Sequence, residues 1–358
     1  MPRANRKAAI EELQKARDGS VVISYITSTR QGLETQMAMD VIGPVYRHLQ
    51  GIKTPPKDTK IDLFIHSNGG DGIVPWRLVT LIRGFCNHFT VLVPNRAFSA
   101  ATLTALGADE VLMHPMGMLG PTDPTVTNQF NPPDPRNLGQ LLGISVEDVT
   151  SFIALVKDDV GINHEDELIQ AFNILAEKVH PLALGNVKRS TLQSRMMGEK
   201  LLRRRGGEEL PDHTIEEIVR KLGSELDYHG HPINSREARE DVGLSFVVDA
   251  PSAVEAVMWK LFLMYETDLK LDQPFMPVQE AMSISPISPA LPPGSPSNPA
   301  GTPNQATVNL GPFRTAYIES ATGCDVFQTE LEVALMRDFQ GNLTPNIILK
   351  SQAWATET

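Results

Sequence analysis

The sequence predicts an α/β protein with a parallel sheet and surrounding helices. Three short, almost continuously apolar runs lie at 61–65, 89–93 and 110–113, and segments of helical spacing separate them. Apolar runs of this kind are typical of strands that are buried on both faces of a parallel sheet. Their alternation with helices at short intervals indicates βαβ units, whose ligand sites lie at the carboxyl ends of the strands.

The elements before this region are a helix, a strand and a second helix. A charged helical pattern covers 4–18, and a β-branched run at 21–26 predicts a strand. Apolar residues at helical spacing over 33–49 predict the second helix. Two consecutive prolines place a loop at 53–60.

Two special turns follow the first two apolar strands of the central region. The turn 67–72 contains three glycines and leads into a predicted helix at 73–86. The second turn, 94–98, leads to Ser99, which opens a predicted helix at 100–108. Both turns fall at strand ends, where a site is expected in this class of fold.

A helical region and a proline-rich tail are expected after residue 124. The helical patterns have ordinary lengths for globular proteins and lie at 145–159, 165–178, 181–205, 214–226 and 251–267. A predicted turn and short helix over 229–238 and a short strand at 244–248 lie between the last two.

The last hundred or so residues change in character. Proline and serine predict an extended linker from residue 272 onward. Beyond it we expect a short helix at 326–336 and a short strand at 347–349, in a tail whose fold the sequence does not identify. The expected division is a domain over 1–271 (core 20–125, helical extension 145–267), a linker over 272–312 and a tail over 313–358.

The composition fits a globular chain with no general affinity for nucleic acid. The chain has 358 residues, 41% of them hydrophobic and 21% charged, and a formal net charge of −11. Nucleic-acid binding requires a basic face, so we expect no nucleic-acid partner.

The cysteines Cys86 and Cys324 form neither a disulfide framework nor a zinc spacing, and His229 and His231 suit a structural turn, so no metal is expected.

No segment of the sequence predicts insertion into a membrane. The first residues lead into a charged helix rather than an apolar signal segment. No stretch reaches the roughly 18 apolar residues that a spanning helix needs. Together with the unpaired cysteines, this pattern favours a cytoplasmic location.

Ser99 is the candidate nucleophile. A serine hydroxyl becomes nucleophilic when a base removes its proton. At the start of a helix, free backbone N–H groups and the helix dipole favour the oxyanion that forms on attack. Serine is also a preferred helix cap, so a purely structural role for Ser99 stays open.

Gly69 and Gly70 are the candidate oxyanion donors. Glycine allows a positive φ and a close approach of the backbone, so its N–H group can point at a carbonyl oxygen. A plain turn is the alternative interpretation. Together, a glycine turn and a serine at a helix start, following adjacent strands, form half of an acyl-transfer site.

Three segments of this region carry a family resemblance. They are His66-Ser-Asn-Gly-Gly, Phe98-Ser-Ala-Ala-Thr-Leu-Thr-Ala-Leu and Met118-Leu-Gly-Pro-Thr-Asp-Pro. They resemble the serine dehydrogenase proteinase family of the ClpP/crotonase superfamily, which contains Clp-like serine peptidases. The resemblance implies a ClpP/crotonase-like fold, serine peptidase-like chemistry, a peptide or protein substrate, and a homo-oligomer.

The resemblance also implies roles for individual residues. It matches Ser99 to the nucleophile, and the backbone N–H groups of Gly69, Gly70 and Ala100 to the donors of the oxyanion hole. No cofactor is expected, since the sequence contains no Gly-x-Gly-x-x-Gly dinucleotide loop and no obvious lysine motif for pyridoxal phosphate.

The base that the nucleophile needs has no clear match. Family members typically carry a lysine shortly after the Gly-Pro-x-Asp-Pro run, whereas this chain has no lysine between Lys60 and Lys157. The corresponding stretch offers Arg136, which stays protonated at neutral pH and cannot act as a base. Clp-type enzymes use a histidine at a position that falls near Thr122 or Asp123.

Four residues remain as candidate bases: His114, Asp123, Lys157 and Lys188. His114 ends the third strand, and a structural histidine is the alternative. Asp123 is a weak base at its ordinary pKa and also suits a turn. The two lysines lie on later helices, where a base would need burial to lower its pKa and where a solvated side chain is the alternative.

Three hypotheses about function follow from these observations. The first is a serine peptidase-like hydrolase, in which Ser99 attacks a peptide carbonyl and backbone N–H groups hold the oxyanion. The second is a catalytically inactive scaffold or binding module with the same fold. A third, weaker hypothesis is a crotonase-like acyl-thioester enzyme. Whether the chain is an enzyme at all depends on the missing base.

Overall fold

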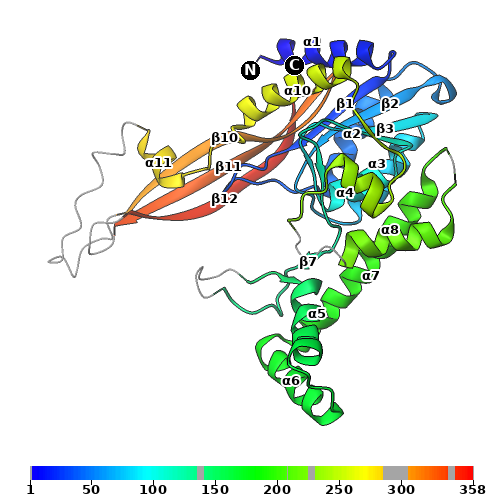
Figure 1. Cartoon of the computed structure of the whole chain (residues 1–358). Helices are drawn as coiled ribbons and strands as arrows, with labels where there is room; N and C mark the ends of the chain where they lie inside the picture. The colour runs from blue at the N-terminus through cyan, green and yellow to red at the C-terminus, as the bar shows by residue number, and fades with distance from the viewer. Residues whose placement is uncertain are drawn as a thin grey trace. The chain divides into compact units, whose positions relative to one another are not determined.

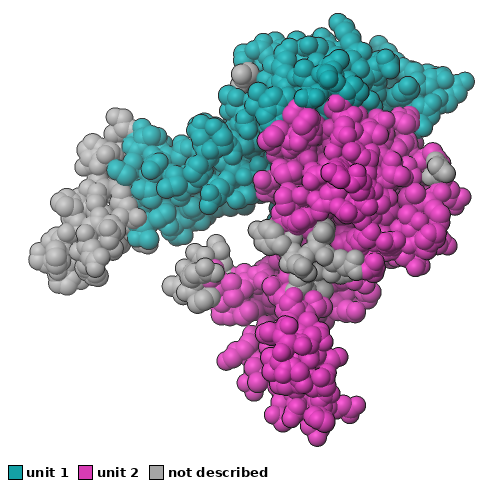
Figure 2. Space-filling view, in the orientation of Figure 1, with its two compact units in different colours: residues 1–67, 85–87, 251–358 teal, residues 68–84, 88–250 magenta. Residues whose placement is uncertain are grey.

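The protein forms two compact units. A computed structural model describes residues 2–134, 141–207, 209–224, 230–284, 305–337 and 343–357 (Figure 1). Unit 1 consists of Met1–Ser67, Phe85–Asn87 and Pro251–Thr358, and unit 2 of Asn68–Gly84 and His88–Ala250 (Figure 2). Both units combine parallel strand pairs with helices, which confirms the predicted α/β class.

Unit 1 joins the two ends of the chain. Its strands follow the order β12-β11-β10-β1-β2, in which β1 and β2 are parallel and the other pairs antiparallel. Val21 lies opposite Ile61, and Ile23 lies opposite Ser320. The strands are β1 (Val21–Thr27), β2 (Lys60–His66), β10 (Gln305–Ser320), β11 (Cys324–Arg337) and β12 (Leu343–Thr356). The helices are α1 (Arg3–Ala16), α2 (Ile42–Gln50), α10 (Ser252–Leu269) and α11 (Pro277–Met282).

Unit 2 contains all the described residues of the candidate site. Its main strands are parallel neighbours: β3 (His88–Val93), β5 (Glu110–Met113) and β9 (Val247–Asp249). Two short pairs accompany them, β4 (Arg96–Ala97) with β6 (Met118–Leu119) and β7 (Thr125–Val126) with β8 (Ile144–Ser145). The helices are α3 (Val74–Arg83), α4 (Ala100–Leu106), α5 (Val146–Ala154), α6 (Glu165–Lys178), α7 (Pro181–Arg204), α8 (Asp212–Ser224) and α9 (Ser235–Glu237).

Helix α4 lies in the core of unit 2, and all of its residues are buried. Gly107, which directly follows α4, packs closely against α3 and α7. A Cβ atom at this position would lie 2.8 Å from Val79 of α3 and 3.0 Å from Leu201 of α7. A larger residue at this position would therefore require the Val79 or Leu201 side chain to shift.

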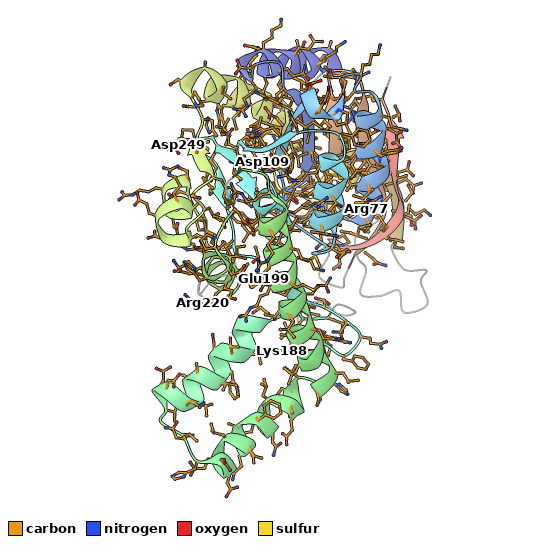
Figure 3. All side chains as sticks on the ribbon, turned by 90° about the vertical axis from the view of Figure 1, so that its right-hand side faces the viewer. Arg77, Asp109, Lys188, Glu199, Arg220 and Asp249 are labelled. Carbon is orange, nitrogen blue, oxygen red and sulfur yellow. The ribbon has the colours of Figure 1, made fainter. Side chains whose placement is uncertain are left out.

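Asp109 fixes the chain directly after α4. Its carboxylate accepts hydrogen bonds from Arg83 at 2.6 Å, from the backbone N–H of Phe89 at 2.8 Å, and from that of Gly206. Burial opposes the charge, but these bonds outweigh it and lower the pKa of Asp109 below its usual value. Figure 3 labels this residue among the side chains of the unit. One carboxylate therefore ties α3, β3 and the chain after α7 together.

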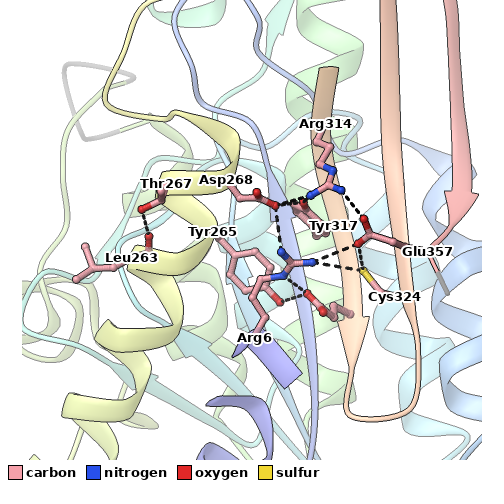
Figure 4. A network of polar contacts seen from close by, with 10 residues as sticks. Arg6, Leu263, Tyr265, Thr267, Asp268, Arg314, Tyr317, Cys324 and Glu357 are labelled. Atoms are coloured by element: carbon pink, nitrogen blue, oxygen red, sulfur yellow. Dashed lines mark hydrogen bonds and ion pairs between the residues drawn. The ribbon is translucent and has the colours of Figure 1, made fainter. Parts of the chain in front are cut away.

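A buried charged network holds unit 1 together (Figure 4). The guanidinium of Arg6 is fully buried, with Nε 2.7 Å from the Glu319 carboxylate and Nη1 3.0 Å from that of Asp268. The Tyr265 hydroxyl donates to Glu319 at 3.0 Å, and the guanidinium carbon lies 4.6 Å from the centroid of the Tyr317 ring. These contacts join α1, α10 and β10.

Most predicted elements are confirmed, with small shifts of their ends. The strands predicted between residues 21 and 113 and the helices predicted between 145 and 267 all have counterparts. The helix predicted over 33–49 is only partly right, because 39–41 forms a 3₁₀ turn and α2 begins at Ile42.

The helix predicted at 326–336 is wrong. These residues belong to β11, which pairs with β10 on one side and β12 on the other. Leu331 and Val333 are buried whereas Glu330 is exposed, as expected for a strand with one face on the core. The tertiary pairing, rather than the local pattern, determines this element.

The carboxyl-terminal part also differs in its details from the sequence-based expectation. The strand predicted at 347–349 lies within the longer β12. Helix α11 and the beginning of β10 lie in the segment where we expected a linker, of which residues 285–304 are outside the described ranges. Both cysteines are buried thiols outside any disulfide among the described residues. Among the helices that the structure describes, none combines the length and the apolar character needed to cross a membrane.

Replacing Arg6 with alanine is expected to lower the free energy of unfolding by about 3–5 kcal/mol, because the Glu319 carboxylate stays buried without its counter-charge. The control is Lys7→Ala on the same helix. Lys7 is exposed and lies 3.8 Å from Glu11, so its loss is expected to cost less than about 0.5 kcal/mol. Urea unfolding of both variants measures the difference. Equal losses would show that the network does not stabilise unit 1.

Candidate active site

Ser99 has an unusual backbone conformation at the junction between β4 and α4. Its φ is +52° and its ψ is −113°. Residues other than glycine rarely adopt a positive φ, and such strain persists only where the surrounding structure enforces it, at a cost of about 1–3 kcal/mol. Strained residues of this kind cluster at functional sites, so the conformation supports a functional role for Ser99.

The side chain of Ser99 does not cap the helix that it precedes. A capping serine accepts a hydrogen bond from a backbone N–H in the first turn of its helix. Ser99, which is half-buried, forms no such bond. This geometry therefore does not support the capping interpretation, because the Ser99 hydroxyl forms no capping hydrogen bond with α4.

The backbone of Gly69 packs directly against Ser99. A Cβ atom at Gly69 would lie 2.7 Å from the Phe98 carbonyl oxygen, 2.7 Å from the Ser99 Cβ and 2.9 Å from the Ala100 nitrogen. Gly69 also has a φ of +97°, which favours glycine. The structure thus brings together the first glycine of the turn, the serine and the first residue of α4, as the sequence analysis expects. Gly70 follows Gly69 in the same turn.

Ala100 contributes a backbone donor next to Ser99. As the first residue of α4, it has no acceptor for its N–H within the helix. The backbone of Gly69 lies next to this nitrogen, since a Cβ atom at Gly69 would lie 2.9 Å from it.

Thr102 holds a further turn, Gly120-Pro-Thr-Asp-Pro, against α4. Its hydroxyl is buried, donates to the Gly120 carbonyl at 2.9 Å, and accepts from the Gly120 N–H at 3.1 Å. The ring of Phe98 packs on the same glycine, since a Cβ atom at Gly120 would lie 2.8 Å from it. Sequence reasoning missed Thr102, although its place three residues after Ser99 in the family-like run is a usable signal.

His114 is engaged in the turn that follows β5. It is buried, and its Nδ1 accepts a hydrogen bond from the Met116 N–H at 3.0 Å. A neutral ring that accepts at Nδ1 carries its proton on Nε2, so it has no second lone pair with which to take a proton. This arrangement fits the structural alternative better than the role of a base.

Asp123 is buried at 2% exposure in a turn that α7 and α8 hold in place. The neighbouring Thr122 donates its N–H to the Leu222 carbonyl at 2.7 Å, and its carbonyl accepts from the Ser194 hydroxyl at 2.6 Å. These bonds support the role of Asp123 in a fixed turn.

The two candidate lysines are exposed. Lys157 lies in the π-helical turn 155–159, and Lys188 lies on α7, where Figure 3 labels it. A lysine that acts as a general base needs a buried environment, which neither position provides. Within the described residues, the Ser99 hydroxyl forms no hydrogen bond to an ionisable side chain. Arg136 lies outside the described residues.

His231 forms no metal site with other described residues. Nε2 of His231 lies 2.5 Å from the Glu237 carboxylate, and His229 is outside the described ranges. Over the part of the chain that the structure describes, no group of three or more metal-binding side chains is found.

The fold and the serine beside the glycine turn define a ClpP-like protein. The chain belongs to the family of ClpP-like SDH-type serine proteinases, which matches residues 2–181, about half of its length. This confirms the family that the resemblance at residues 60–125 indicates. Peptides are the substrates of such proteinases, so the family defines the class of chemistry but not the catalytic residues.

Two relatives come from the archaeon Methanocaldococcus jannaschii. The uncharacterized protein MJ0137 is 26% identical over 263 residues, which are 71% of this chain and 77% of that protein. The uncharacterized protein MJ1495 is 30% identical over 131 residues, which are 34% of this chain and 42% of that protein.

Two solved structures of mutants of the 1510-N membrane-bound stomatin-specific protease are also similar. One is 17% identical, covers 42% of this chain and 68% of its own, and has a TM-score of 0.25. The other, in complex with a substrate peptide, is 14% identical, covers 68% of this chain and 97% of its own, and has a TM-score of 0.26.

Gly69→Ala is expected to destabilise unit 2 by more than about 1 kcal/mol, because the new methyl group meets backbone atoms of Phe98 and Ala100 at a positive φ. Gly72→Ala is the matched control in the same turn. A Cβ atom there has no neighbour within 4 Å, and a change within about 0.5 kcal/mol is expected. Thermal unfolding of the two variants compares them, and equal midpoints would contradict the close contact.

Proposed function

We propose that this protein is a serine peptidase-like hydrolase with Ser99 as its nucleophile. In this proposal the backbone N–H groups of Gly69 and Ala100 hold the oxyanion, and Gly70 is a further donor. The observation that carries the proposal is the packing of Gly69 on the Ser99 Cβ and the Ala100 nitrogen. The strained backbone of Ser99 and the membership in a family of serine proteinases support it.

The reaction would proceed by acyl transfer from a peptide to Ser99. The serine oxygen bonds to the peptide carbonyl carbon, its proton passes to a base, and the carbonyl oxygen becomes an oxyanion that the backbone donors stabilise. The carbon–nitrogen bond then breaks, and the leaving amine takes the proton. Water releases the acyl group in a second round of the same steps.

The base of this reaction stays unassigned among His114, Asp123, Lys157 and Lys188. Nδ1 of His114 already accepts a hydrogen bond, and both lysines are exposed. In this arrangement these three residues are therefore poorly suited to act as the base. This observation favours the second candidate function, a catalytically inactive scaffold or binding module of the ClpP-like fold. No described residue or pocket favours acyl-thioester chemistry, the third hypothesis.

A fluorophosphonate probe tests the proposal, because it reacts covalently with activated serines. We expect the probe to label the wild-type protein and not Ser99→Ala, while Ser151→Ala, which removes an exposed serine of α5, is labelled like the wild type. Labelling is measured by in-gel fluorescence and intact mass. A folded wild-type protein that stays unlabelled would favour the inactive scaffold, and equal labelling of Ser99→Ala would exclude Ser99 as the nucleophile.

We further propose a homo-oligomer located in the cytoplasm. The resemblance to Clp-like peptidases supports the assembly, and Cys86 and Cys324, which form no disulfide, fit a reducing compartment. Light scattering coupled to size exclusion measures the mass in solution. We expect a multiple of the 39.3 kDa chain, and a single monomeric species would reject the assembly.

A further inference from the structure

Arg96 lies beside the candidate nucleophile, and the mechanism above gives it no role. It is a half-buried residue of β4, three positions before Ser99. Its Nη1 donates to the Asn68 Oδ1 at 3.0 Å, and its guanidinium carbon lies 5.1 Å from the centroid of the Phe98 ring. Asn68 precedes Gly69 and Phe98 precedes Ser99, so both residues that hold Arg96 are neighbours of the proposed oxyanion donor and nucleophile.

These contacts fix the guanidinium without using all of its donors. A guanidinium has five N–H donors in a planar fork. Asn68 accepts from one of them, and the buried Nε has no hydrogen-bond partner. The contact with the Phe98 ring restricts the side chain and leaves the remaining donors for another acceptor.

The charge of Arg96 is not neutralised by the part of the protein that the structure describes. Within those residues no carboxylate forms an ion pair with it. Two arginines with little exposed side chain are paired instead: Arg83 lies 2.6 Å from Asp109, and Arg30 lies 3.1 Å from Glu280.

We propose that Arg96 binds a carboxylate of the substrate next to the bond that Ser99 attacks. The inference rests on the proposed function, because the site of attack defines where the substrate lies. Arginine pairs with carboxylates through two parallel hydrogen bonds, which fix both position and orientation. The carboxylate belongs to an acidic side chain or to the carboxyl end of a peptide. Arg96 is thus a specificity-determining residue for acidic peptides.

Binding is measured in the Ser99→Ala background, so that no cleavage is required. The probes are fluorescein-labelled decapeptides of alanine, serine and leucine with an amidated end and one glutamate at each position in turn. Matched peptides carry glutamine instead, and a third set carries glutamine with a free terminal carboxylate. Fluorescence anisotropy gives the affinity of each peptide for the folded, full-length protein.

We expect at least one carboxylate-bearing peptide to bind about tenfold more tightly than its neutral partner. A glutamate preference assigns the acidic side chain, and a preference for the free acid assigns the chain end. Adding Arg96→Gln should abolish the preference, and Arg96→Lys should retain part of it. The control Arg77→Gln, at an exposed position of α3 that Figure 3 labels, should keep the full preference.

The proposal is overturned if carboxylate and neutral peptides bind equally, or if the preference survives in a folded Arg96→Gln protein. Thermal unfolding establishes that each variant is folded. Fluorophosphonate labelling of the protein with intact Ser99 is measured separately. A preference without labelling rejects the hydrolase but keeps the carboxylate site, whereas labelling without a preference rejects the carboxylate site alone.

Discussion

The contact between Gly69 and the backbone at Ser99 and Ala100 is the constraint on which the candidate site depends. Any side chain at Gly69 would occupy the volume that these atoms fill. The contact brings the glycine turn against the start of α4, where Ser99 has a backbone conformation that serine normally avoids. Such strain relaxes unless the chain is held firmly on both sides of the serine.

Helix α4 and its attachments hold the chain on both sides. Its residues are all buried, and Thr102 forms two hydrogen bonds with Gly120, one as donor and one as acceptor. Beyond the helix, the charge of Asp109 is stabilised by Arg83 and by backbone N–H groups. Packing and electrostatics therefore act together on a helix of seven residues, which is too short to be stable by itself.

The sequence predicts the local parts of this architecture better than the parts that depend on distant residues. The strand at 61–65 is predictable because burial on both faces leaves a continuous apolar pattern. The nearness of Gly69 and Ser99 is predictable because their turns end neighbouring strands. The segment 326–336 fits a helix or a strand locally, and pairing with β10 decides between them. The environment of Arg96 is not predictable from the sequence, because it includes Asn68 from another turn. The base is not predictable either, because no spacing rule places one beside Ser99.

Unit 1 is assembled from the first and last parts of the chain, and this affects the order of folding during synthesis. Arg3 of α1 donates to the Glu357 carbonyl at 3.2 Å, and β1 pairs with β10. Because the ribosome releases the chain from its amino end, the residues of unit 2 are available before β10 exists. A nascent chain can therefore complete unit 2 while α1 and β1 still lack β10, and Asp268, Glu319 and Glu357, which are made later, then enclose Arg6.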